Sequence, residues 1–354
     1  MRKGWEYKKL GDCTQILDSQ RKPVTKRDRK SGIYPYYGAT GIQDYVDKYI
    51  FDGRFVLVGE DGAKWSSFTQ SAFIIEGKTW VNNHAHVLRT NDFLVDSFLV
   101  YFLNYSDLDS YISGAIIRKL TQASLRNIDI PLPPKSTQLA IVSELDKINE
   151  LIRLKKEQLK DFDNLAQSLF YEMFGDPVEN EKGWEVKKLG EICEIFAGGD
   201  KPKDMCEIQN NEYIYPVIAN GEGEKGILGY TKNCRVTKEA VTIGARGASI
   251  GNCRIVKNGF TPAIRLLTLI PTGSIDCCFL YYFVKDLNYK QNGAGQAQLT
   301  VPNIKCEFIP LPPLPLQHLF AQRIEQIERE KSEVQKSIQD LETLLASRMQ
   351  YWFE

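Results

Sequence analysis

The sequence predicts two mixed α/β (α+β) domains in tandem, each followed by a long helix, with the two helices forming an antiparallel coiled coil. Three observations predict this architecture. An opening motif returns 179 residues later, a proline-rich motif returns at the same offset, and each proline-rich motif precedes a heptad-patterned segment. Self-similarity at a long, constant offset is the signature of a duplicated structural unit. We therefore expect a chain with pseudo-two-fold symmetry.

The repeated motifs set the expected boundaries. Gly-Trp-Glu-x-Lys-Lys-Leu-Gly occupies 4–11 and 183–190, and Ile-Pro-Leu-Pro-Pro occupies 130–134 and 309–313. Because both return with one offset, the duplication covers the whole unit. We expect domains at 1–135 and 176–314, and helices at 136–175 and 315–354.

The two globular parts predict many short strands. Residues 55–58 and 240–243 are apolar runs typical of buried strands. Each run leads into a glycine turn, at 59–63 and 244–248, where glycine predicts positive φ and close backbone approach. The two halves differ in sequence but match in length, so we expect one fold with different exposed side chains. Alternating polarity predicts a further strand at 81–88.

Each long segment has apolar side chains at alternating steps of three and four, which is the a/d pattern of a coiled coil. Lys155 and Lys331 each interrupt one seam, and a polar seam residue can fix register. The equal lengths and constant offset favour pairing within the chain, with packing on each helix's own domain or on another chain as alternatives. The expected seam residues are Leu145, Ile148, Ile152, Leu159, Phe162, Leu169, Ile324, Ile327, Val334, Ile338, Leu341 and Leu345.

Composition and charge exclude several classes of protein. The chain is 43% hydrophobic and 25% charged, as in ordinary globular proteins, and has no apolar run of about 20 residues. Its eight cysteines show no Cys-x-x-Cys spacing, which argues against a disulfide framework or zinc site and favours the cytoplasm. Net charge is zero, but 21–30 holds six bases and one acid. A solvated loop and phosphate contact are both open for that segment.

The motifs as a set resemble the specificity subunit of type I restriction–modification systems. The resemblance covers the whole chain: two units open with the Gly-Trp motif, close with Ile-Pro-Leu-Pro-Pro-x-x-x-Gln and continue into a long helix. It implies that each unit is a target-recognition domain for one half of a split double-stranded DNA sequence. It also implies that the helices form a spacer on which two methyltransferase subunits dock.

The resemblance also implies that this chain is not an enzyme and binds no cofactor. S-adenosylmethionine would be bound by the methyltransferase subunits, and ATP and Mg by two restriction (motor–nuclease) subunits if these join. The chain has no cofactor glycine motif, and Gly77-Lys78-Thr79 is preceded by Ala72 where a P-loop requires glycine. The alternatives are a coiled-coil adaptor with two protein-binding domains, or a stand-alone DNA-modifying enzyme.

Candidate DNA contacts come from glycine-containing polar loops. Arginine and lysine suit guanine and phosphate, glutamine suits adenine, and carboxylates suit cytosine N4. For any one of these residues, an ordinary surface role is the alternative. The first domain offers Arg21, Lys22, Glu60, Asp61, Lys64, Trp65, Arg118, Lys119 and Gln122. The second domain offers Lys201, Lys203, Arg246, Ser249, Gln296 and Gln298.

Two histidines raise the question of a metal site. His84 and His86 would share one face of the strand expected at 81–88. No third ligand is apparent in the sequence, so we expect no metal and a buried or hydrogen-bonded role.

The seam gives a testable prediction. Replacing Ile148 or Phe162 with aspartate should disturb domain spacing and methyltransferase assembly together, because a charge would enter the apolar seam. Size-exclusion chromatography with the methyltransferase and mapping of the methylated sequence measure the two effects. Loss of preference for one half-site alone would contradict the paired coil.

Overall fold

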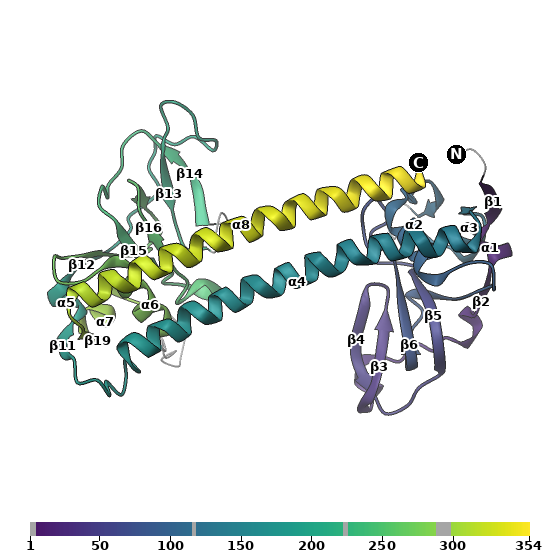
Figure 1. Cartoon of the computed structure of the whole chain (residues 1–354), viewed down its shortest axis with the longest axis horizontal. Coiled ribbons are helices and arrows are strands. Elements are labelled where there is room, and N and C mark those ends of the chain that lie inside the picture. The colour runs from purple at the N-terminus through teal and green to yellow at the C-terminus, as the bar shows by residue number, and fades with distance from the viewer. Residues whose placement is uncertain (1–4, 115–117, 222–225, 288–298) are drawn as a thin grey trace. The chain divides into compact units, whose positions relative to one another are not determined.

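The computed structural model divides into two compact units. The first comprises residues 1–157 and 335–354, and the second comprises 158–334. Two long helices, α4 (Lys135–Phe174) and α8 (Leu314–Phe353), each contribute to both units (Figure 1). The residues that the structure describes are 5–114, 118–221, 226–287 and 299–354.

The domain of the first unit is built on a six-stranded sheet with the order β2-β7-β5-β6-β3-β4. Neighbouring strands are antiparallel except β3 and β6, which are parallel. Helix α2 (Asp96–Tyr105) packs its apolar side against the face that carries Val56, Val58 and Leu88. The strands are β2 (Thr14–Ile16), β3 (Ser31–Gly38), β4 (Gly41–Val46), β5 (Phe51–Gly59), β6 (Ala72–Val81) and β7 (Ala85–Thr90).

The domain of the second unit repeats this order with one break. Strands β12-β18-β15-β16 form one sheet and β14-β13-β17 another, so β16 and β17 together replace the single long strand β6. The parallel pairing of β3 with β6 recurs between β13 and β17, and α6 (Cys277–Asp286) takes the place of α2. The strands are β12 (Cys193–Ala197), β13 (Tyr215–Ile218), β14 (Ile227–Thr231), β15 (Ala240–Ile243), β16 (Cys253–Val256), β17 (Thr261–Pro262) and β18 (Leu267–Pro271).

The expectation of one duplicated α/β fold is therefore confirmed, and so are the buried strands at 55–58 and 240–243. The strand expected at 81–88 is wrong, because β6 ends at Val81 and β7 begins at Ala85. Asn82 explains the break: its Oδ1 accepts a hydrogen bond from the backbone N–H of His84, which closes an Asx turn.

The repeated motifs pair with each other at the two ends of each domain. β1 (Glu6–Lys9) is antiparallel to β10 (Asp129–Leu132), and β11 (Glu185–Lys188) is antiparallel to β19 (Phe308–Leu311). The opening motif thus pairs with the proline motif, which explains why both return at the same offset. The remaining short α-helices and strands are α1 (Leu10–Cys13), β8 (Ile112–Ser113), β9 (Lys119–Leu120), α3 (Gln122–Arg126), α5 (Leu189–Ile192) and α7 (Val301–Cys306).

The last glycine of each opening motif lets two short helices approach closely. A Cβ at Gly11 would lie 3.1 Å from the Arg126 side chain in α3, and one at Gly190 would lie 3.1 Å from Lys305 in α7. Contacts this tight require the neighbour to move, so glycine is favoured at both positions.

In the first unit, the beginning of α4 lies antiparallel to the end of α8. Leu145 shares a core with Met349 and Leu345. Glu144 accepts hydrogen bonds from the guanidinium of Arg348 and, at 3.1 Å, from Nε1 of Trp352. An ion pair of 2.8 Å joins the Lys156 Nζ and the Glu342 carboxylate.

In the second unit, the end of α4 lies antiparallel to the beginning of α8. The seam lysine Lys331 donates to Asp163 at 2.8 Å. It therefore forms an ion pair between the two helices at the position where it interrupts the apolar seam. Of the expected seam residues, seven are buried and the rest are half-buried. The buried ones are Leu145, Ile148, Ile152, Ile324, Ile327, Val334 and Ile338, and the half-buried ones are Leu159, Phe162, Leu169, Leu341 and Leu345.

Near its end, α4 buries residues that the heptad pattern did not include. Phe170 is 1% exposed and Phe174 is 3% exposed. Both pack against Phe279 of α6 and Phe320 of α8. An α-helix drifts relative to a strict heptad, so the buried side of α4 turns toward the domain of its own unit.

A buried glutamine links each domain to its long helix. Oε1 of Gln138 accepts from the Val95 N–H, and Nε2 donates to the carbonyls of Phe93 and Pro133, all at 2.9 Å. Gln317 makes the equivalent bonds to Asp276 N–H at 2.8 Å and the Pro312 carbonyl at 2.7 Å. This is the glutamine of the Ile-Pro-Leu-Pro-Pro-x-x-x-Gln motif.

We expect Gln138→Met to destabilise the first unit by about 1–3 kcal/mol, because it leaves buried backbone groups without partners. Hydrogen exchange of peptides covering 93–103 measures the loss. Gln317→Met is the matched control, with the loss expected in 274–284 instead. Unchanged protection in both variants would contradict a linking role.

Candidate DNA interface

Four loop segments of the first domain meet where β5 ends and β7 begins. The backbone of Glu60 accepts from the N–H of Leu120 and donates to the carbonyl of His84, both at 2.8 Å. Arg21 donates to the carbonyl of Ala85 at 2.7 Å. The four segments are 18–22, 59–66, 82–85 and 118–122.

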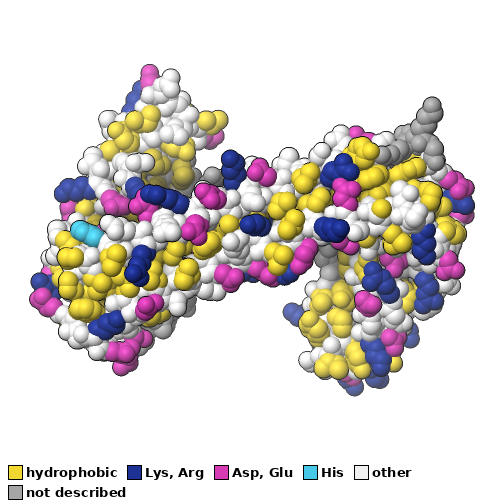
Figure 2. Space-filling view, viewed as in Figure 1, with side chains coloured by type: hydrophobic (Ala, Val, Ile, Leu, Met, Phe, Trp, Pro, Cys, Tyr) yellow, Lys and Arg dark blue, Asp and Glu magenta, His cyan; other side chains and the backbone are white. Residues whose placement is uncertain are grey.

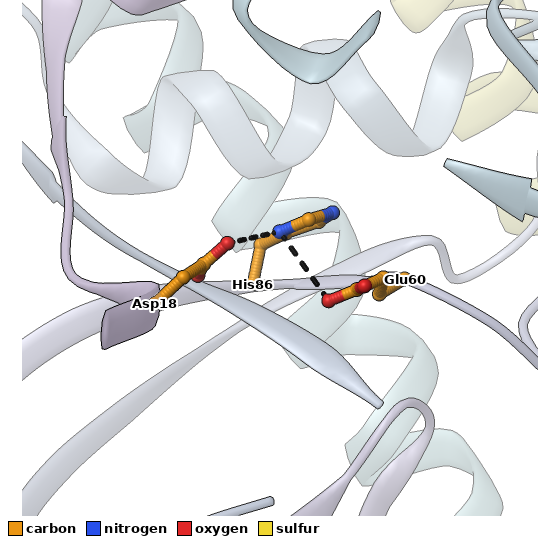
Figure 3. Close-up of side chains that lie close together, drawn as sticks. All are labelled: Asp18, Glu60 and His86. Carbon is orange, nitrogen blue, oxygen red and sulfur yellow. Dashed lines mark hydrogen bonds and ion pairs between the residues drawn. The ribbon is translucent and has the colours of Figure 1, made fainter. Parts of the chain in front are cut away.

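A buried polar cluster lies beneath these loops and consists of Asp18, Glu60 and His86 (Figure 3). His86 is fully buried, with Nδ1 2.6 Å from Asp18 Oδ2 and 3.7 Å from Glu60 Oε2. Its Nε2 lies 2.8 Å from the carbonyl oxygen of Leu120. Each ring nitrogen therefore faces an oxygen acceptor.

Two basic side chains complete the cluster. Arg21 Nη1 lies 2.5 Å from Glu60 Oε2, and Lys119 Nζ lies 2.6 Å from Glu60 Oε1. Arg21 also lies 3.3 Å from Asp18. Both buried carboxylates are thus paired, which is the condition under which buried charge is tolerated.

The pairing governs the acidity of the two carboxyls. Burial alone would raise the pKa of Asp18, but hydrogen bonds from His86 and the Val87 N–H, together with the nearby Arg21 charge, hold it below its usual value. Burial would likewise raise the pKa of Glu60, but hydrogen bonds from Lys119 and Arg21 lower it. Both groups are therefore kept as carboxylates.

The cluster has the ligand types of a metal site, but its charge and geometry do not fit a cation. Arg21 and Lys119 already neutralise the two carboxylates, and a divalent ion would add excess charge. Nδ1 of His86 contacts Asp18 Oδ2 directly at 2.6 Å, which is a hydrogen-bond distance. The arrangement is that of a hydrogen-bonded ion network.

Two exposed side chains project from this network to the surface. The Lys119 side chain is 43% exposed although its Nζ is held by Glu60. Gln122 is exposed, and its Nε2 donates to Asp18 Oδ2 at 3.2 Å. Asp61 and His84 lie at the edge of the same surface, with 2.5 Å between Oδ1 and Nδ1.

The glycine turn of the first domain forms a shallow pocket beside this surface. Gly62 has a φ of 68°, as expected for such a turn, and Trp65 is buried with Nε1 donating to the Gly59 carbonyl at 3.1 Å. The pocket has a volume of about 450 Å³ and lies between Lys64 and Arg118.

The candidates of the first domain therefore divide into two groups. The side chains of Arg21, Glu60 and Trp65 are buried or nearly so and bonded within the domain. In this structure they organise the loops. The remaining candidates present exposed or half-exposed side chains, namely Lys22, Asp61, Lys64, Arg118, Lys119 and Gln122.

The second domain builds the same turn without acidic side chains. A Cβ at Gly244 would lie 1.9 Å from the Ser249 carbonyl, and Gly247 has a φ of 59°. Asn220 Oδ1 accepts from the Ala245 N–H at 2.7 Å, which anchors the turn through a neutral amide. Lys201, Lys203 and Arg246 are exposed and Ser249 is half-buried, whereas Gln296 and Gln298 lie outside the described residues.

Sequence reasoning missed Asp18, although it expected the buried and hydrogen-bonded role that His86 has. Asp18 is 68 residues away from His86 along the chain, so no local spacing joins them. A usable signal was present in the placement of the histidine, between Ala85 and Val87 in an apolar strand. A polar residue at a buried strand position requires a partner.

Comparisons with protein-family profiles and with known sequences point to the same family. A profile of the family described as "Type I restriction modification DNA specificity domain" matches residues 2–161 and 181–343. A putative type I specificity subunit of Mycoplasma pneumoniae is 28% identical over 318 residues, which cover 86% of this chain and 85% of that protein. A putative type I restriction enzyme specificity subunit of Haemophilus influenzae is 42% identical over 146 residues, 41% of this chain but only 38% of that protein.

Solved structures show the same fold. The chain is similar to the S subunit of a type I restriction–modification system from M. genitalium, with a TM-score of 0.60, 15% identity and coverage of 99% and 96% of the two chains. It is also similar to a chain from a study of complex assembly and conformational transition of the type I R–M system. That match has a TM-score of 0.61, 20% identity and coverage of 100% and 98%.

The lowered pKa values of Asp18 and Glu60 predict acid sensitivity of the first domain. Groups with a depressed pKa stabilise the fold above the unfolded value of about 4, and this contribution is lost as pH falls through the folded value. Hydrogen exchange of 85–90 should therefore accelerate below about pH 4, beyond the intrinsic pH effect. Asp18→Asn should flatten this dependence, and an identical profile in that variant would contradict the assignment.

Proposed function

The chain belongs to the family of type I restriction–modification DNA specificity proteins, and we propose that each of its two domains reads one half of a split double-stranded DNA target. It is a specificity subunit, which recognises the DNA sequence, while the enzymatic steps lie in partner subunits. The observation that carries the two-half proposal is the repeated strand order, β2-β7-β5-β6-β3-β4, which recurs with different side chains on its turns.

The direction of the helices supports a bipartite target. In the first unit the start of α4 pairs with the end of α8, and in the second unit the end of α4 pairs with the start of α8. Antiparallel pairing of duplicated helices is consistent with a pseudo-dyad, which matches the two-fold symmetry of duplex DNA. We expect half-sites separated by an unread gap, on the order of one helical turn or about 34 Å.

The side-chain types of the exposed loop residues determine which DNA groups each domain can contact. In the first domain Lys22, Lys64 and Arg118 suit phosphate or guanine, and Gln122 suits adenine. In the second domain the exposed Lys201, Lys203 and Arg246 provide positive charge on the corresponding loops. Because the two sets differ in side-chain type, we expect two different half-sites.

The outward faces of the helices support docking of partner subunits. Leu165 of α4 and Leu344 of α8 are 52% and 46% exposed and are related by the 179-residue offset. Figure 2 shows basic and acidic side chains interspersed with apolar ones along the visible face of the helices. Exposed apolar side chains with a charged rim are typical of protein interfaces.

A further apolar depression lies on α4 between Leu139 and Leu151. We expect these faces to hold two methyltransferase subunits, which would bring S-adenosylmethionine, and restriction subunits that would bring ATP and Mg.

No helix among the described residues combines the length and apolar composition that a membrane span requires.

Domain exchange tests the proposal. Replacing residues 1–135 with the equivalent domain of a relative should change one half of the methylated sequence and leave the other intact, because each domain holds its own loops. Replacing 176–314 instead is the matched control and should change the other half. Methyladenine sequencing reads both outcomes, and changes in both halves from one exchange would refute the modular assignment.

A further inference from the structure

The buried cluster Asp18–Glu60–His86 has apolar counterparts in the second domain. Val58 pairs with His86 in the first domain, and Ile243 pairs with Leu267 in the second. Each of these strand ends is followed by the glycine turn, so Glu60 corresponds to Ala245. Ile16 and Ile195 occupy equivalent positions opposite Leu88 and Leu269, which makes Ala197 the counterpart of Asp18.

The backbone around the two sets is nevertheless the same. The N–H of Leu120 donates to the Glu60 carbonyl at 2.8 Å, and the N–H of Leu299 donates to the Ala245 carbonyl at 3.0 Å. Leu267 and Ala245 are buried in the second core. The fold therefore forms with Ala, Ala and Leu at these three positions, and it does not require the charges of the first domain.

We propose that the buried cluster of the first domain positions Lys119 and Gln122 on the DNA-reading surface and so determines the half-site that this domain selects. The proposal rests on the function proposed above. Glu60 holds the ammonium of Lys119 at 2.6 Å, and Asp18 holds the amide of Gln122 at 3.2 Å. His86 and Arg21 fix the two carboxylates in turn.

Each of the two exposed side chains proposed to contact bases is thus bonded to a buried carboxylate, which anchors it. A lysine on the surface is a flexible point charge, and a flexible charge can contact any phosphate. Anchoring restricts Lys119 and Gln122 to one arrangement, which base discrimination requires because hydrogen bonds to base edges depend on geometry. Glu60 and Asp18 are positioning residues in this account, since they act through Lys119 and Gln122.

The consequence is a separation of specificity from affinity. Removing an anchor leaves the positive charge of Lys119 on the surface, so binding to unrelated DNA should persist. Discrimination among bases should fall, because Lys119 or Gln122 is no longer held in one arrangement by its carboxylate. A residue with only a structural role would reduce binding to all sequences together.

The experiment uses the full chain assembled with its methyltransferase subunits. The target sequence is first identified by methyladenine sequencing, and duplexes are made with each base pair of either half replaced in turn. The variants are Asp18→Asn and Glu60→Gln, alone and together, which preserve volume but remove the charge and replace one acceptor oxygen of each carboxylate with an NH2 donor. Gln138→Met is the matched control, because it removes a buried hydrogen-bonded amide of the same unit away from the cluster.

We expect wild-type protein to disfavour each replaced base pair by about 5- to 150-fold, the usual cost of a mismatch. In the double variant, discrimination should fall below about 3-fold at one or more positions of the first half and remain unchanged throughout the second half. Affinity for unrelated DNA should stay within about 3-fold of wild type. Gln138→Met should leave discrimination in both halves intact.

Other outcomes would overturn the inference. Unchanged discrimination in the double variant, or equal losses in both halves, would show that the cluster does not position the readers. A rise in melting temperature with Zn²⁺ that the double variant lacks would make the cluster a metal site instead. Failure of the wild-type complex to bind any sequence selectively would instead remove the proposed function, and with it the premise of this inference.

Discussion

The closure of each domain onto its long helix is the constraint on which the rest of the structure depends. The first strand of each domain pairs with the strand that leads into the helix, β1 with β10 and β11 with β19. Gln138 and Gln317 then bind the proline carbonyls and the backbone ahead of α2 and α6. A domain closed in this way tolerates different side chains on its candidate DNA-contact loops, because none of the closing contacts comes from those loops.

The sheet and the closing contacts, which together form the frame of each domain, are separate from the candidate DNA-contact loops. This separation explains how one fold can serve two different half-sites. The second domain divides its sheet between β16 and β17 and still keeps the strand order of the first. It also replaces three buried polar residues with alanine, alanine and leucine. The frame depends on backbone pairing and apolar packing, so polar side chains at the turn are left to vary.

The sequence predicted the fold well because the signals of the frame are local. The repeated motifs, the apolar strands and the heptads each lie within a short window, and the structure confirms the fold they indicate. Contacts that join distant segments were missed. Asp18 meets His86 across 68 residues, and Phe170 and Phe174 turn from the seam toward α6. The strand expected at 81–88 fails because Asn82 closes a turn. Among the candidate contacts, composition alone could not separate the bonded Arg21, Glu60 and Trp65 from the exposed Lys22 and Lys64.

The central claim is that one chain selects two separate half-sites. Sequencing genomic methyladenine in the source organism, with and without this gene, tests the claim most directly. The account predicts that deletion abolishes one methylation motif, and that this motif consists of two different short sequences separated by an unread gap. An uninterrupted motif, or methylation that is unchanged by the deletion, would contradict it.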